Sequence, residues 1–134
     1  MDLPLATGTS VKITNTPDRA EDQPAWSPTG DRIAYTRVSE VSRSGNRTDI
    51  YSIPATGGAE LRITSKATSG SPRNGGACYS PDGQFISFWS GSQWSVSSPL
   101  GDDAIYRIKA DGTGKAIKII GSKSASWHVN RWRR

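Results

Sequence analysis

The sequence is poor in the residues that carry most catalytic and metal chemistry. It contains 1 cysteine and 1 histidine in 134 residues. A single cysteine excludes an internal disulfide, and one cysteine with one histidine cannot build an ordinary zinc site. Cys78 lies in Ala77-Cys78-Tyr79, which we predict to be a buried strand, so we interpret it as a structural thiol. His128 is interpreted as a surface or partly packed side chain rather than a catalytic base.

Motifs for cofactors, nucleophiles and targeting are also missing. There is no Gly-x-Ser-x-Gly nucleophile elbow, no Gly-x-Gly-x-x-Gly or Walker loop, and no calcium-loop pattern. We therefore predict no catalytic residue, no cofactor and no metal site, and interpret Gly57-Gly58, Gly75-Gly76 and Asp102-Asp103 as turn residues. No apolar run is long enough to span a membrane, and residues 1–8 lack the pattern of a secretory signal. The compartment stays open: cytoplasmic as written, periplasmic if a leader has been removed.

The composition that remains is typical of a turn-rich β protein. Hydrophobic residues make up 34% of the chain, mean hydropathy is −0.57, and there are 14 glycines and 8 prolines. The net charge of +5 is uneven, because residues 104–134 hold 8 basic side chains against one acidic residue, Asp111. The basic excess is therefore a property of the C-terminal quarter of the chain.

The chain contains an internal repeat. Residues 26–30 (Trp-Ser-Pro-Thr-Gly) return as residues 79–83 (Tyr-Ser-Pro-Asp-Gly), and residues 49–53 (Asp-Ile-Tyr-Ser-Ile) return as 104–108 (Ala-Ile-Tyr-Arg-Ile). Leu61-Arg62-Ile63-Thr64 has an earlier copy at Val11–Thr14 and a later copy at Ile117–Ile120. Several segments repeated in one order at near-constant spacing indicate a repeat architecture, in which neighbouring units bury each other's apolar faces.

Each repeat predicts four short antiparallel strands. The first copy gives strands over 24–26, 32–36, 49–53 and 61–64; the second gives strands over 77–79, 85–89, 104–108 and 117–120. Ser-Pro-x-Gly and Gly-rich segments form the turns. The polar stretches 37–48 and 90–102 are predicted to be loops, and we find no useful helical periodicity. Four antiparallel strands recurring about every 50 residues describe blades of a β-propeller.

The repeat also resembles a known family. Residues 26–35 with Asp49-Ile50-Tyr51 and Leu61–Thr64 look like the TolB-type propeller repeat. The second copy departs from that pattern at Tyr79, Ala104 and Ile120. The resemblance implies an all-β fold with two four-stranded propeller blades and partial flanking strands. The positions marked as structural are Trp26, Ser27, Pro28, Gly30, Asp49, Ile50, Tyr51, Tyr79, Ser80, Pro81, Asp82, Gly83, Ile105 and Tyr106.

Two blades do not close a ring, so the repeat organisation predicts that further blades are supplied from outside this segment. We assign residues 1–14 to the tail strand of a preceding blade, 15–64 to blade 1, 65–120 to blade 2, and 121–134 to the start of an incomplete third blade with a basic tail. Two open sheet faces favour a homo-oligomer, with a trimer giving six blades, or the remainder of a split propeller. A strand swap through residues 3–14 is a variant of the same idea.

The leading functional hypothesis is a non-enzymatic propeller that binds proteins through its loops. The alternatives are a non-catalytic propeller fragment of a larger enzyme, such as a prolyl-oligopeptidase-like peptidase or a polysaccharide lyase, and a basic nucleic-acid binder. Mixed aromatic and arginine residues near the C-terminus suit the last of these, but no nucleic-acid-binding fold supports it. Candidate partner contacts are Trp94, Trp127, Arg131 and Trp132.

Overall fold

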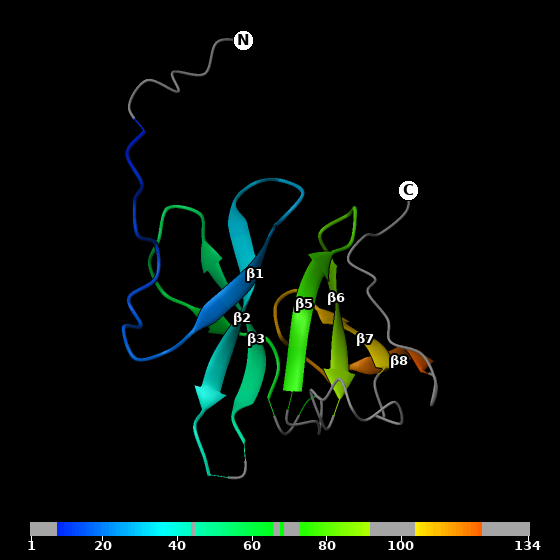
Figure 1. Cartoon of the computed structure of the whole chain (residues 1–134). Helices are drawn as coiled ribbons and strands as arrows, with labels where there is room; N and C mark the ends of the chain where they lie inside the picture. Colours follow the sequence, from blue (N-terminus) through cyan, green and yellow to red (C-terminus); the bar gives the residue numbers. More distant parts are fainter. Residues whose placement is uncertain (1–7, 44, 66–67, 69–72, 92–103, 122–134) are drawn as a thin grey trace.

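The computed structural model (Figure 1) describes residues 8–43, 45–65, 68, 73–91 and 104–121, and its elements are β-strands. They are β1 (Glu21–Trp26), β2 (Arg32–Glu40), β3 (Arg47–Pro54), β4 (Leu61–Arg62), β5 (Arg73–Tyr79), β6 (Phe85–Gly91), β7 (Ala104–Lys109) and β8 (Ile117–Gly121). One mixed sheet connects them in the order β1-β2-β3-β5-β6-β7-β8, with β4 paired to β3. The predicted all-β class is confirmed.

The sheet consists of two antiparallel units, which Figure 1 shows side by side. Strands β1 to β4 form unit 1, and β5 to β8 form unit 2, with each strand antiparallel to the next. The units are joined by one parallel pairing, between Thr48 of β3 and Arg73 of β5. The prediction of four antiparallel strands per repeat is therefore confirmed.

The Ser-Pro-x-Gly turns have the same geometry in both units. In unit 1 the Gly30 amide donates to the Ser27 carbonyl at 3.0 Å; in unit 2 Gly83 donates to Ser80 at 2.8 Å. Gly30 and Gly83 have φ of 74° and 73°, a left-handed conformation that favours glycine. The serine hydroxyls accept from the amides that begin the following strands, at 3.1 and 3.0 Å. The repeated sequence thus produces repeated backbone.

The two faces of each unit differ, because side chains alternate along a strand. The ring-stack face, as we call it, carries a pair of stacked rings: Tyr35 on Tyr51 in unit 1, and Phe88 on Tyr106 in unit 2. Both pairs have centroids 6.1 Å apart, with interplanar angles of 23° and 22°. The opposite face, the reverse face, carries Ala34 in unit 1.

The main core lies between the units. The reverse face of unit 1 packs on the ring-stack face of unit 2, and the buried residues are Ala34, Ile50, Ile63, Ala77, Tyr79, Ile86, Phe88 and Ile108. A second, smaller cluster lies on the ring-stack face of unit 1, where Ile13 and Ile33 pack against Tyr35, Tyr51 and Ile53. Neither unit buries its apolar surface alone, as expected for a repeat architecture.

The predicted loops are shorter than expected. Strands β2 and β3 continue to Glu40 and from Arg47, so residues 37–40 and 47–48 of the predicted 37–48 loop are strand. Polar residues extend this ladder because Ser39 and Arg47 bind Asp49 instead of water. In the predicted 90–102 loop, Ser90 and Gly91 belong to β6, and residues 92–102 lie outside the described part.

Three further local predictions need correction or comment. Gly75-Gly76 is not a turn but part of β5, where the ladder has a bulge between Gly75 and Cys78. Only Leu61–Arg62 of the predicted strand 61–64 is strand, because the amides of Ile63 and Thr64 both turn to the Ile50 carbonyl. Residues 11–14 form no strand in this structure, and their assignment to a preceding blade stays a prediction.

Candidate functional site

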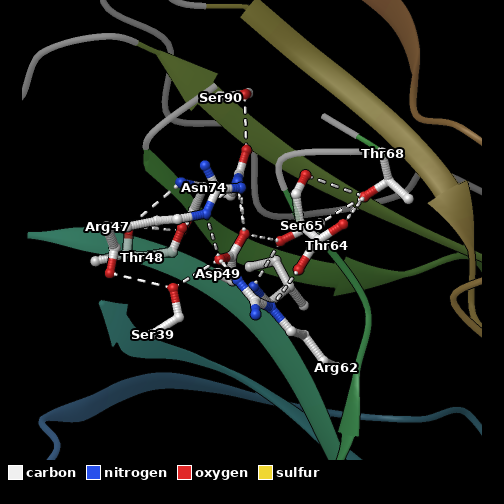
Figure 2. Close-up of polar contacts among 11 residues, drawn as sticks. Ser39, Arg47, Thr48, Asp49, Arg62, Thr64, Ser65, Thr68, Asn74 and Ser90 are labelled. Carbon is white, nitrogen blue, oxygen red and sulfur yellow. Dashed lines mark hydrogen bonds and ion pairs between the residues drawn. The ribbon is translucent and has the colours of Figure 1, made fainter. Parts of the chain in front are cut away.

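A buried carboxylate, Asp49 of β3, is the centre of the densest polar cluster in the described part of the chain (Figure 2). Asp49 is 0% exposed and accepts six hydrogen bonds. Its Oδ1 receives Thr64 Oγ1 at 2.6 Å, Asn74 Nδ2 at 3.0 Å and Arg47 Nη2 at 3.0 Å. Its Oδ2 receives Ser39 Oγ at 2.7 Å, Arg47 Nε at 2.8 Å and Arg62 Nη2 at 2.7 Å.

The electrostatics of the cluster favour the charged carboxylate. Burial by itself raises the pKa of Asp49, but hydrogen bonds from Arg47, Thr64, Ser39 and Arg62 outweigh it, so the pKa lies below its ordinary value. Arg47 is 5% exposed, which makes its bidentate pair with Asp49 a buried ion pair. Removing either partner would leave a buried charge uncompensated.

The cluster ties the units together. Ser39, Asp49 and Arg62 come from β2, β3 and β4 of unit 1, whereas Asn74 comes from β5 of unit 2. Asn74 is 0% exposed, and its Oδ1 accepts from Ser90 Oγ of β6 at 2.7 Å. Thr48 and Asn74 add three further bonds across the same junction, at 3.0, 3.2 and 3.4 Å. Figure 2 shows these side chains converging on one carboxylate.

This arrangement suits a structural joint better than a reactive site. A carboxylate has about four lone-pair positions, and six donors at Asp49 leave none free for a substrate or a cation. Within the described ranges, no group of three or more His, Cys, Asp and Glu side chains lies close enough to hold a metal ion. We interpret the Asp49 cluster as the latch between the units.

A small hollow of about 190 Å³ lies between the units beside this latch. Gln23 borders it in the left-handed conformation, φ 53°, unusual for a residue with a side chain. Its Oε1 accepts from Thr36 Oγ1 at 3.0 Å and from the Gly76 amide of unit 2 at 2.9 Å. Trp89 covers Gly75 so closely that a Cβ there would lie 2.5 Å from the indole. The bulged strands β1 and β5 therefore contact each other directly, through Gln23 and Gly76.

The predicted structural residues fall into three places. Ser27, Pro28, Gly30, Ser80, Pro81, Asp82 and Gly83 form the two turns, where Ser80 donates to Asp82 at 2.6 Å. Asp49, Ile50, Tyr51, Ile105 and Tyr106 lie in β3 and β7. Trp26 and Tyr79 end β1 and β5 at equivalent positions, yet Trp26 is 61% exposed and Tyr79 is 8% exposed. Trp94, Trp127, His128, Arg131 and Trp132 lie outside the described residues, as does the Asp102-Asp103 pair.

Several residues of the latch were not found from the sequence. Arg47 stands two residues before Asp49, and alternation along a strand places both side chains on one face. This spacing is a sequence signal for the Arg47–Asp49 pair. The sequence gives no comparable signal for Asn74, because the glycines that follow it are typical of a turn. Cys78 lies in β5 as predicted, although it is only partly buried.

Comparison with solved structures identifies a relative of the fold. The chain is similar to a protein from Agrobacterium tumefaciens provisionally described as TolB, with a TM-score of 0.57 and 30% identity over 82% of this chain. This similarity supports a TolB-like fold. The chain spans 33% of the length of that relative.

A curated relative has no described function. It is the uncharacterized protein Atu1656 of Agrobacterium fabrum, 33% identical over 102 residues, which are 76% of this chain and 29% of that protein. No family model matches the chain. A helix long and apolar enough to cross a lipid bilayer is not found among the described residues. The chain thus spans about a third of the length of each relative.

Proposed function

We propose that this protein is a non-enzymatic β-propeller scaffold, whose two units are blades that bind protein by stacking against further blades. The observation that supports the proposal is a difference in solvent exposure between residues at equivalent positions of the two units. Tyr79 is 8% exposed because unit 1 covers it, whereas its equivalent Trp26 is 61% exposed. Ile63 is 1% exposed because unit 2 covers it, whereas its equivalent Ile119 is 45% exposed.

Each open position lies on the side where a neighbouring blade would stand. Trp26 opens toward a preceding blade, and Ile119 toward a following one. The exposed side chains of β8, Ile117, Ile119 and Ile120, form an apolar edge, which soluble proteins ordinarily cover or protect with charge. The interface between units 1 and 2 supports one docking geometry, in which the ring-stack face of one blade packs on the reverse face of another.

We propose that other copies of this chain supply the missing blades. A trimer would place six blades in a ring, within the usual range of about 4–8. The TolB-like relative supports this number, because two blades account for about a third of its length. In the trimer each contact is head-to-tail, and the rotation must close for a ring to form rather than a fibre.

Recognition of a further protein would use the loops at one rim of the scaffold. Loops carry most recognition on rigid frames because they vary without disturbing the core. In unit 1 that segment is residues 41–46, between β2 and β3. The contact role predicted for Trp94 remains part of this proposal.

Sedimentation equilibrium at micromolar concentration tests the assembly. We expect a particle of three times 14.4 kDa, in equilibrium with monomer on dilution. A folded particle of 14.4 kDa across the whole concentration range contradicts the proposal. Ile119→Asp is the matched variant, since a charge on the open face should return the particle to monomer, whereas Thr113→Asp in the exposed β7–β8 turn should leave it unchanged.

A further inference from the structure

The segment Val11–Thr14 lies on unit 1 as Leu61–Thr64 lies on unit 2. In unit 2, Ile63 packs with Ile86, Phe88 and Ile108, and Tyr106 packs against this cluster. In unit 1, the repeat equivalents of those residues are Ile33, Tyr35, Tyr51 and Ile53, and Ile13 packs with them. Ile13 therefore fills in unit 1 the position that Ile63 fills in unit 2.

Two glycines confirm this equivalence at the level of the backbone. A Cβ on Gly112 would lie 3.7 Å from the Ile63 carbonyl oxygen, and a Cβ on Gly57 would lie 3.7 Å from the Ile13 carbonyl oxygen. Gly57 and Gly112 are separated by 55 residues, the same repeat interval that relates Tyr51 to Tyr106. The segment thus occupies the slot of a last strand from a preceding blade.

The segment fills that slot incompletely. It has no strand pairing in this structure, and Val11 is 80% exposed. A hollow of about 270 Å³ remains beside it, bordered by Val11, Ile13, Pro24, Ile33, Tyr35 and Ile53. In the interface inside the chain, Ala34 and Ile50 of the neighbouring unit occupy the corresponding space. The segment therefore takes the place of the last strand of a preceding blade, but it does not supply the apolar sheet face that such a blade would pack against unit 1.

Unit 2 carries residues equivalent to those that unit 1 contributes to the interface inside the chain. Its last strand presents Ile119, 45% exposed, where unit 1 has Ile63. Ile105 of the reverse face stands where unit 1 has Ile50, and it is 5% exposed in the single chain. The charges are also complementary. Glu21 and Asp22 border the hollow on unit 1. On unit 2, Lys115 lies just before β8 and Lys118 lies within it.

We propose that Val11–Thr14 is a built-in competitor for assembly: it occupies the slot on unit 1 into which Ile117–Ile120 of a second copy docks, and it must leave before that copy binds. This inference rests on the proposed stacking of blades. The segment lowers the affinity between copies, because only the fraction of molecules with an open slot is competent to bind. It also covers Tyr35 and Tyr51 of unit 1 in the free chain.

Sedimentation equilibrium on four variants of the full chain tests the competition. Ile13→Ser loosens the segment and should lower the dissociation constant between copies by about tenfold. Lys12→Ala, at the exposed neighbouring position, should leave it unchanged. Ile119→Asp should abolish association, and the double variant Ile13→Ser/Ile119→Asp should stay monomeric, which shows that the gain from Ile13→Ser is docking and not aggregation.

The outcomes separate this inference from the proposed function. If the parent chain associates and Ile119→Asp blocks it, but Ile13→Ser leaves the association unchanged or weaker, the competitor role is wrong and the stacking of blades stands. If Ile13→Ser associates and Ile119→Asp does not reverse it, the docking of Ile117–Ile120 is wrong. If neither the parent nor Ile13→Ser associates at any concentration, both proposals fail.

Discussion

The two ring stacks of this protein are alike in geometry and differ in what covers them. Phe88 and Tyr106 of unit 2 lie against unit 1, within the main core. Among the described residues, no further unit lies against Tyr35 and Tyr51 of unit 1. Their cover is Ile13, together with Arg37, whose guanidinium lies 3.8 Å from the centroid of the Tyr51 ring.

Charged groups take part in the cover on unit 1. Glu60 pairs with Arg37 and accepts a hydrogen bond from Tyr35 Oη at 2.7 Å. Burial, and then this contact with Glu60, raise the pKa of Tyr35. The comparison teaches that the repeat specifies the shape of a blade, whereas the neighbours of each blade decide what lies on its faces.

The latch shows a second contrast between the units. Asp49 accepts hydrogen bonds from two arginines of its own unit and from Asn74 of unit 2. The equivalent residue in unit 2 is Ala104, which is 2% exposed. Unit 2 keeps the burial at this position without the charge. The latch therefore belongs to the junction between units 1 and 2, and the part of unit 2 that the structure describes has no carboxylate at the position equivalent to Asp49.

The largest expected effect comes from breaking the latch. Asp49→Ala leaves Arg47 buried without its carboxylate and should lower the free energy of unfolding by about 3–5 kcal/mol. Urea denaturation followed by circular dichroism measures the loss. Asp18→Ala, at an exposed position, is the control and should change stability by less than about 0.5 kcal/mol. Equal effects of the two variants would contradict the role of Asp49.

The covered and open isoleucines give the sharpest matched pair. Ile63→Ala removes a side chain from the core between the units and should cost about 2–5 kcal/mol of stability. Ile119→Ala, at the equivalent open position, should cost less than about 0.5 kcal/mol in dilute monomer. The same denaturation experiment, run well below the concentration at which copies associate, compares them. A similar loss for both would mean that Ile119 is already covered in the single chain.

The fit of β5 against β6 predicts a smaller effect. Gly75→Ala puts a methyl group into the Trp89 indole and should destabilise the protein by about 1–3 kcal/mol. The double variant Gly75→Ala/Trp89→Leu provides room for that methyl group, so its loss should be smaller than the sum of the two single losses. Strict additivity in thermal unfolding would show that the contact with Trp89 does not limit this position.

The pH dependence of stability tests the latch without removing atoms. The folded-state pKa of Asp49 lies below its ordinary value of about 3.9, so its contribution is fully present above that pH. The contribution is lost as the pH falls through the folded-state pKa. Asp49→Asn should therefore be less stable at pH 7 and show a flatter decline below about pH 4. Parallel curves for the two proteins would contradict the assignment.

The sequence predicts the repeated parts of this fold well. Turn residues at fixed positions and apolar alternation locate the eight strands and both Ser-Pro-x-Gly turns, because local geometry alone requires those residues. Strand ends are predicted less well. Ser39 and Arg47 look like loop residues in the sequence, yet they are strand because a buried carboxylate takes their hydrogen bonds.

The junction between the units is harder to read from the sequence. Asn74 and Gln23 act through partners about 25 and 53 residues away, Asp49 and Gly76, which no local pattern reveals. Gly75-Gly76 resembles a turn, although tertiary packing against Trp89 is what requires a glycine at position 75. Residues that contact another unit need the three-dimensional arrangement before their role can be recognised.

Hydroxyl-radical footprinting of Trp26 and Tyr79, at dilute and at concentrated protein, tests most directly whether open blade faces become covered by further blades. We predict that labelling of Trp26 falls severalfold as the particle grows, while Tyr79, already covered within the chain, stays poorly labelled throughout. Labelling of Trp26 that remains as high in the assembled particle as in the monomer would contradict the account.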